Sequence, residues 1–190
     1  MTGRPRSVHG LIVVDLQAGF VSGAGAVPAA SGLVTAVGEL MTAARASGAL
    51  VVQLQNDGPA GSPDEPGTAG WELFLPAEPR DAEHVLSKRA DDGFEGTGLA
   101  GLLAVHGIRD LALCGLLSEM CVSATARSAL RLGYRVVLPH DAHATYDIPA
   151  VDGLAELVPH TMVSRAAEWA LGDQIDVIAR AADIRFEPPR

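Results

Sequence analysis

One cysteine, delivered by a polar turn that follows an apolar run, is the residue of this chain best suited to act as a nucleophile. Cys121 follows the run 111–117, and the pattern after it predicts a helix. A helix start favours thiolate over thiol, because free N–H groups and the helix dipole stabilise negative charge. The alternative is a buried cysteine that only packs, which is the common state of this residue. Catalysis by Cys121 therefore requires a base and a cation from elsewhere in the chain.

Two charged residues at the ends of other apolar runs could be that base and that cation. Asp15 follows residues 11–14, and Lys88 ends the run 84–88. Taken alone, Asp15 could be a turn or capping residue and Lys88 an exposed strand end. In a parallel sheet, however, residues at the carboxyl ends of strands share one edge. A carboxylate, an ammonium and a thiol at that edge are the groups that an activated nucleophile needs.

The elements that would position these residues follow from an alternation of short apolar runs with helical patterns. This alternation predicts an α/β fold, a three-layer α/β/α sandwich around a mostly parallel six-stranded sheet. The strands are expected at 11–16, 49–55, 84–88, 110–117, 135–139 and 161–164. Helices are expected at 33–44 before Gly48, at 99–105 before Gly107, from 122 to near Gly133, and at 166–182. The last helix could pack on the sheet or form a subunit interface.

Two polar segments interrupt this alternation, residues 56–79 and 89–97. Both follow strand ends, and the first is rich in Gly, Pro and acidic residues. A segment that long without regular structure is typical of a lid or a binding loop. We therefore expect both segments to border the site.

Length, charge and cysteine content limit the class of protein. The 190 residues suggest one domain at 9–185 between an N-terminal tail, 1–8, and a C-terminal tail, 186–190. The net charge of −9 disfavours nucleic acid as a partner, and no apolar run is long enough for a signal peptide or a membrane span. Two cysteines form no disulfide framework, so we expect a cytoplasmic protein that acts on a small molecule.

Four short motifs are spread in order over most of the chain. They are Ile-Val-Val-Asp15-Leu-Gln17-Ala-Gly-Phe20, Lys88 with Phe94-Glu-Gly-Thr97-Gly-Leu99, Gly115-Leu-Leu-Ser-Glu-Met-Cys121-Val, and Asp141-Ala-His143-Ala-Thr145. In order and spacing they resemble the isochorismatase-like cysteine hydrolases. The resemblance implies a sheet in the order 3-2-1-4-5-6 and a catalytic triad of Asp15, Lys88 and Cys121.

The resemblance also implies a reaction. Isochorismatases lack the nucleophilic cysteine, so Cys121 points to hydrolysis of a C–N bond through a thioester. The backbone N–H groups of Leu117 and Cys121 match the family's oxyanion hole, and a cis peptide is implied at Leu116–Leu117. An enol-ether hydrolase of the isochorismatase type and a non-catalytic binding domain of the same fold are the alternatives.

No metal or other cofactor is expected. Relatives with a metal site carry an Asp-x-His…His pattern after the second strand, where this chain has Gln53-Leu-Gln55-Asn56-Asp57. No histidine lies between His9 and His84. His140 and His143 have ligand-like spacing, but the sequence nearby supplies no third ligand.

The residues expected to bind the substrate lie near the triad in the sequence. Phe20, Trp71 and Phe94 could form apolar walls, although Trp71 could equally anchor its loop. Hydrogen bonds to the substrate are expected from Gln17, Gln55 and Ser118, with Glu119 beside them.

An acidic rim contains Asp91, Asp92, Glu95 and Glu119. It could simply be solvated, or it could attract a cationic substrate. The chain is similar to the family's streptothricin hydrolases, which open a lactam, in its acidity and in lacking the metal motif. The family also implies a homodimer or homotetramer.

Overall fold

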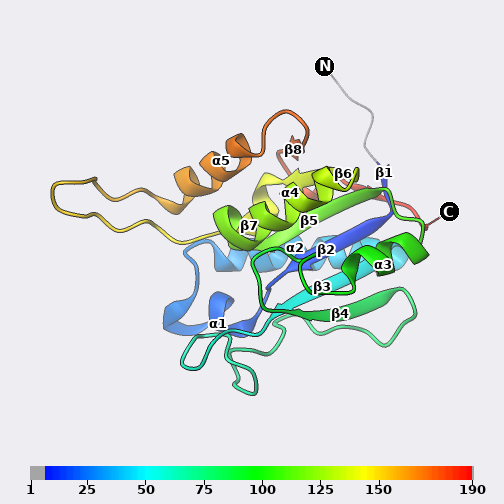
Figure 1. Ribbon diagram of the computed structural model, residues 1–190, viewed down its shortest axis with the longest axis horizontal. Coiled ribbons are helices and arrows are strands. Elements are labelled where there is room, and N and C mark those ends of the chain that lie inside the picture. The colour runs from blue at the N-terminus through cyan, green and yellow to red at the C-terminus, as the bar shows by residue number, and fades with distance from the viewer. Residues whose placement is uncertain (1–6, 190) are drawn as a thin grey trace.

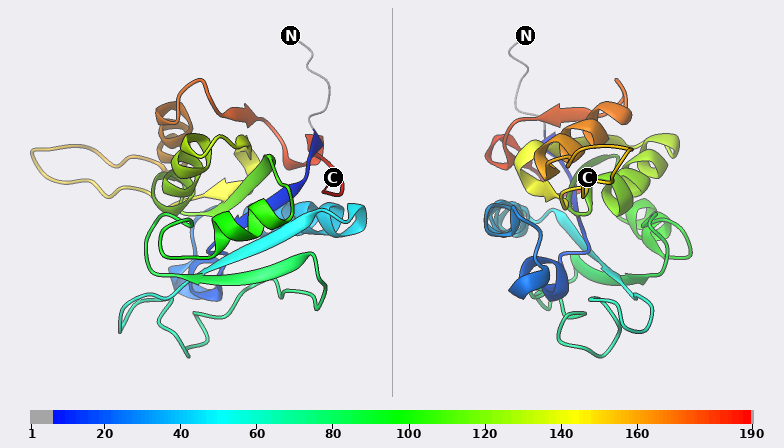
Figure 2. Two further views of the ribbon diagram at one scale, coloured as in Figure 1. Left: turned by 45° about the vertical axis from the view of Figure 1, so that its right-hand side comes forward. Right: turned by 90° about the vertical axis from the view of Figure 1, so that its left-hand side faces the viewer.

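A parallel β-sheet runs through the molecule, with helices on both faces (Figures 1 and 2). The computed structural model describes residues 7–189. The strands lie in the order β4-β3-β2-β5-β6-β8, so the expected order 3-2-1-4-5-6 is confirmed. Their bounds are β2 Gly10–Val14, β3 Leu50–Asn56, β4 Glu83–Lys88, β5 Asp110–Leu116, β6 Arg135–Pro139 and β8 Asp176–Ile178. A short strand, β7 His143–Ala144, also pairs with β5.

Two hydrophobic layers enclose the sheet because its strands bury both faces. Helix α2 (Ala30–Ser47) packs on one face, and α3 (Leu99–Val105) and α4 (Ser123–Arg131) pack on the other. Alternate residues of β2 serve the two layers: Leu11 and Val13 pack with α2, while Ile12 and Val14 pack with α3 and α4. Gly48 ends α2 in the left-handed conformation, as expected of a C-cap.

The other helical segments complete the fold. They are α1 Ala18–Val21, α5 His160–Ala170, the 3-10 turns Gly23–Gly25, His140–Ala142 and Ala181–Asp183, and one turn of π-helix, Ser118–Val122. In the described residues, 7–189, no helix combines the length and the apolar character that a membrane span requires.

The sixth strand and the last helix were predicted in the wrong places. Residues 161–164 lie in α5, and the expected helix 166–182 ends at Ala170, after which the chain forms β8 beside β6. The first turn of α5 is capped by Asp147, whose Oδ1 accepts a hydrogen bond of 2.6 Å from the His160 N–H. That cap comes from 13 residues upstream, so a local pattern of β-branched residues could not reveal it.

The two ends of the described chain pair with each other. Ser7–Val8 (β1) lies parallel to Arg185–Phe186 (β9) in a two-stranded sheet. These residues fall in or beside the segments that we expected to be tails. The rest of the N-terminal tail, residues 1–6, and residue 190 lie outside the described residues.

Two long connections leave the body of the fold. The expected loop 56–79 is found at 57–82, because Asn56 ends β3; these residues contain no helix or strand and are tied to the site by a bridge between Gln17 and Leu73. Residues 147–158 form a narrow hairpin that projects from the molecule, drawn in yellow in Figures 1 and 2. Its bridges join Ile148 to Val158 and Val151 to Ala155.

Candidate active site

Asp15 lies just beyond β2, in a backbone conformation that is uncommon for a residue with a side chain. Its φ angle is 50°. The strand ladder still holds it, because its N–H donates to the Leu54 carbonyl at 3.0 Å, and the Gln17 N–H donates to its carbonyl at 2.7 Å. The side chain is buried, and Oδ1 has no hydrogen-bond partner among the described residues. One oxygen of the carboxylate is therefore free to accept a proton.

Lys88 occupies the centre of the site. It ends β4, where the register pairs it with Asn56 of β3. Its buried Nζ lies 2.8 Å from Asp15 Oδ2 and 3.3 Å from Cys121 Sγ. The same ammonium donates to Asn56 Oδ1 at 3.2 Å and to the Ala90 carbonyl at 3.1 Å. The three residues predicted to form a triad thus meet in space.

Cys121 reaches this position through a kinked turn. The turn Ser118–Val122 links β5 to α4, and Met120 within it has non-helical backbone angles. The peptide bond between Leu116 and Leu117 is cis, at the place that the resemblance implied. Gly115 lets β5 approach β2, because a Cβ there would lie 2.0 Å from the Val14 carbonyl oxygen. Its φ of 118° also favours glycine.

The sequence led us to expect a thiolate at Cys121, but the structure favours the protonated thiol. Burial raises the pKa of Cys121, the Asp15 carboxylate raises it further, and Lys88 only partly opposes them. Burial also raises the pKa of Asp15 to about 6, although Lys88 and the Cys121 thiol act in the opposite direction. For Lys88, burial lowers the pKa, but Asp15 and Cys121 outweigh it, so the ammonium stays charged. At neutral pH the resting site therefore contains a carboxylate, an ammonium and a protonated thiol.

Gln17 and Gln55, expected to bind substrate, form hydrogen bonds to the backbone at the end of β3 and in the 57–82 loop. Gln17 Nε2 donates to the carbonyls of Asn56 and Trp71, at 3.0 and 2.9 Å, and its Oε1 accepts from the Asn56 N–H at 2.9 Å. Gln55 Nε2 donates to the same Trp71 carbonyl at 2.9 Å. Trp71 is half-buried, and its indole N–H donates to Asp57 at 3.0 Å. Trp71 is thus anchored in its loop, which was the alternative to its forming an apolar wall of the substrate site.

The other residues expected at the substrate have their own partners. Phe94 stacks on Tyr134 with a centroid distance of 6.0 Å, and Phe20 packs against the core on the α2 side. Ser118 is buried and faces away from solvent, with its Oγ 2.8 Å from His143 Nδ1. Glu119 is exposed and accepts a hydrogen bond of 2.9 Å from Thr145.

Two residues at the site were not assigned to it from the sequence. Asn56 joins Lys88 to the buried Asp64, to whose Oδ2 its amide donates at 2.6 Å. Asp91, expected only as part of an acidic rim, places Oδ1 3.6 Å from Cys121 Sγ. Asn56 directly follows the expected strand 49–55, so the rule that placed Asp15 at the sheet edge could also have indicated Asn56, which the register pairs with Lys88. The contact made by Asp91 depends on how its loop folds.

Comparison with known proteins shows the family of this chain. A family model for the isochorismatase domain matches residues 9–166, a range that includes Asp15, Lys88 and Cys121. The chain belongs to the isochorismatase family of hydrolases. A crystal structure of an isochorismatase from Pseudomonas putida superposes with a TM-score of 0.84 at 29% identity, covering 96% of this chain and 93% of that one.

Relatives within the family include proteins named as hydrolases, one of them as an amidohydrolase. Two streptothricin hydrolases from Streptomyces noursei are each 58% identical to this chain. The alignments cover 96% and 95% of this chain and 66% and 72% of those proteins, so it spans about two thirds of their length. The ureidoacrylate amidohydrolase RutB of Variovorax paradoxus is 32% identical, over 70% of this chain and 67% of that protein.

Proposed function

We propose that this protein is a cysteine-dependent amidohydrolase that cleaves a C–N bond of a small molecule through a thioester intermediate. The observation that carries the proposal is the position of Lys88 Nζ, in contact with both Asp15 and Cys121. One cation there can stabilise either the carboxylate or a transient thiolate. The unpaired Oδ1 of Asp15 supplies the acceptor for the thiol proton.

The first half-reaction forms the thioester. The Cys121 proton passes to Asp15 as Sγ attacks the carbonyl carbon, because the raised pKa of the buried thiol disfavours a free thiolate. Electrons of the carbonyl move to its oxygen, and the N–H groups of Leu117 and Cys121 donate to that oxyanion. The C–N bond then breaks, and Asp15 returns the proton to the leaving nitrogen.

The second half-reaction releases the acid. Asp15, again ionised, takes a proton from water as the water oxygen attacks the thioester carbonyl. The C–S bond breaks, and the thiolate of Cys121 leaves beside Lys88 and regains its proton from Asp15. A carboxyl group that acts as both base and acid works best with a pKa near the working pH. The pKa of Asp15, raised by burial to about 6, meets that requirement.

The substrate that we propose is a cationic cyclic amide such as the streptothricin lactam. The 58% identity to two streptothricin hydrolases supports it. So does the carboxylate of Asp91, exposed at the surface and 3.6 Å from the nucleophilic sulfur. A cationic group beside the scissile bond would lie against Asp91, and the net charge of −9 would favour its approach.

Competition between a cationic lactam and a neutral ureido compound tests the substrate class. We expect a higher kcat/KM for the lactam and a fall in that preference as salt is raised. Asp91→Asn should reduce the preference, while Glu39→Gln, an exposed change on α2 outside the acidic rim, should leave it intact. A preference for the neutral compound that salt does not alter would refute the cationic substrate.

The two alternative functions make different demands on Cys121. Enol-ether hydrolysis would not need a thiol, and a binding domain would not need the triad at all. Buried charge is costly to maintain, and the site contains a buried Asp15–Lys88 ion pair beside the thiol. A pair of that kind next to a nucleophile favours catalysis by cysteine over either alternative.

We further propose that the protein forms homodimers or homotetramers and acts in the cytoplasm on its small-molecule substrate, without nucleic acid or membrane as a partner. The projecting hairpin exposes Ile148, Val151, Leu154 and Leu157, and Trp169 of α5 is also exposed. A second copy of the chain would cover these apolar side chains. Both cysteines are free thiols, which suits a reducing compartment. Light scattering on the wild type and on Leu154→Asp tests the assembly.

A further inference from the structure

A second cluster of titratable side chains lies where the turn after β6, strand β7 and helix α5 meet. One carboxylate oxygen, Glu168 Oε1, lies 2.5 Å from His140 Nδ1 and 3.0 Å from His143 Nε2. Among the described residues, these three form the one group of histidine, cysteine and carboxylate side chains whose donor atoms converge within 4.8 Å. We propose that His140, His143 and Glu168 bind a divalent transition-metal ion, with zinc as the representative case.

The donor set suits such an ion. Two imidazoles and one carboxylate are a common ligand set for Zn²⁺ and for Fe²⁺, and they leave at least one coordination position open. Metal–ligand bonds of about 2.0–2.2 Å would require donor atoms roughly 3–3.5 Å apart. His143 Nε2 and Glu168 Oε1 are near that separation already. His140 must withdraw by less than about 1 Å, and its side chain is free to do so because it is 49% exposed.

The outer partners of a metal site are also present. His143 is buried, and its Nδ1 lies 2.8 Å from Ser118 Oγ, which directs Nε2 toward Glu168. The serine hydroxyl can accept from Nδ1–H and donate to Ser164 Oγ at 3.0 Å, which leaves a lone pair on Nε2. The second oxygen of Glu168 accepts from Arg165 at 3.2 Å, so Oε1 would bind the ion alone. Such hydrogen bonds orient the ligands of known metal sites.

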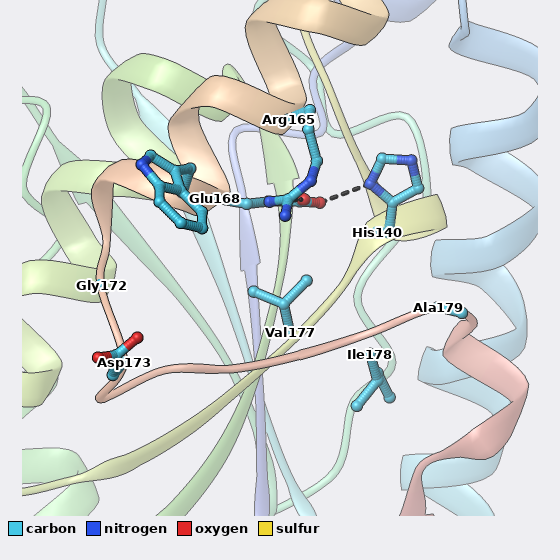
Figure 3. Close-up of a pocket in the computed structure, with 9 residues that line it drawn as sticks. His140, Arg165, Glu168, Gly172, Asp173, Val177, Ile178 and Ala179 are labelled. Atoms are coloured by element: carbon cyan, nitrogen blue, oxygen red, sulfur yellow. Dashed lines mark hydrogen bonds and ion pairs between the residues drawn. The ribbon is translucent and has the colours of Figure 1, made fainter.

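A pocket gives access to the cluster (Figure 3). It has a volume of about 720 Å³, and His140 and Glu168 form part of its wall. The view shows the imidazole of His140 and the carboxylate of Glu168 directed at each other at the pocket's upper edge. A metal ion could therefore enter from solvent, and water or a small ligand could occupy the open position.

The site would act on the nucleophile only at a distance. Ser118 belongs to the same turn as Cys121, and the Ser118 carbonyl accepts a hydrogen bond of 2.7 Å from Ser123 Oγ. An ion bound by His143 would fix that turn through Ser118 without touching the substrate. We therefore expect metal binding to raise thermal stability. The inference goes beyond the proposed hydrolysis and does not depend on it.

Zinc titration of metal-free Cys121→Ala protein tests the site, because this background removes the accessible thiol as a competing ligand. Calorimetry should show one Zn²⁺ per chain, and Tm should rise with zinc. In the same background, His140→Asn should weaken zinc binding at least tenfold. The matched control is His160→Asn, which removes another imidazole paired with a carboxylate, 2.8 Å from Asp147, and should change affinity less than twofold.

Cobalt(II) provides a readout that loss of fold would not mimic. Absorption bands typical of nitrogen and oxygen ligands should appear on adding cobalt, vanish on adding zinc, and be absent in Glu168→Gln. Far-UV circular dichroism should show that the variants remain folded. No binding at a tenfold molar excess of zinc would overturn the proposal. Equal losses of zinc affinity in His140→Asn and His160→Asn would also overturn it. Since turnover is not measured, failure here is distinct from failure of the proposed hydrolysis.

Discussion

The ammonium group of Lys88 lies 2.8 Å from the carboxylate of Asp15, and both side chains are buried. A buried ion pair of this kind is costly to desolvate, and it contributes little to stability unless its geometry is well satisfied. Here Asp15 Oδ1 stays unpaired while Lys88 Nζ also reaches Cys121 Sγ. The pair therefore suits proton transfer better than it suits stability.

The pH dependence of hydrolysis should follow the ionisation of Asp15 in this pair. Because burial raises the pKa of Asp15 to about 6, kcat/KM should fall tenfold per pH unit below about pH 6. The sign follows from the mechanism, since a protonated Asp15 cannot accept the thiol proton. A pH–rate profile in buffers of constant ionic strength measures it.

Asp15→Asn is the control for that profile. The amide cannot accept the proton, so activity should fall by at least about 10³-fold, and any residual activity should lack the acid limb. An unchanged limb near pH 6 in Asp15→Asn would assign the titration to another group.

The attachment of the 57–82 loop beside Asn56 should depend on Gln17 more than on Gln55. Gln17→Leu removes three hydrogen bonds, two to the N–H and carbonyl of Asn56 at the end of β3 and one to the Trp71 carbonyl in the loop. We expect a loss of about 3 kcal/mol in the free energy of unfolding. Gln55→Leu removes one hydrogen bond, to the Trp71 carbonyl, which still accepts a hydrogen bond from Gln17. This change should lower the free energy of unfolding by about 1 kcal/mol. Urea unfolding of both variants measures the difference, and equal losses would contradict this role for Gln17.

Gly115 should tolerate no side chain. Gly115→Ala would place a Cβ 2.0 Å from the Val14 carbonyl oxygen at a φ of 118°, so we expect destabilisation of more than about 3 kcal/mol or failure to fold. Gly101→Ala in α3 is the matched control, because its Cβ would meet nothing within 4 Å. That change should be neutral or stabilise by up to about 1 kcal/mol. A stable, folded Gly115→Ala protein would show that the two strands can separate at this point.

The central strands and the triad could be predicted because their signals are local. Continuous apolar runs mark buried parallel strands, and a polar residue directly after such a run lies at the sheet's carboxyl edge. For Asp15 that rule was sufficient, whereas Lys88 ends β4, an edge strand whose Val85 is exposed, so its strand was marked by position more than by a buried run. For Cys121 the rule was sufficient to place the thiol at the site, but the raised pKa of the thiol depends on burial, which only the folded chain shows.

Contacts between distant segments could not be predicted in the same way. Glu168 completes the cluster with His140 and His143 only because α5 folds back over β7. Likewise, α5 begins where Asp147 caps it across the projecting hairpin. Gln17 has a polar side chain that could bind a substrate, yet its amide is fully used by the backbone of Asn56 in β3 and of Trp71 in the loop. In each case the residue type was visible in the sequence and its partner was not.

Mass spectrometry of the quenched reaction tests the thioester most directly. With a slowly hydrolysed amide or lactam, we predict an added mass equal to the acyl group, located on Cys121 and absent from the buried Cys114. Hydroxylamine should remove it, and Cys121→Ala should neither form it nor turn over substrate. Full turnover by Cys121→Ala, or hydrolysis by the wild type with no acyl group on Cys121 at any time, would contradict the account.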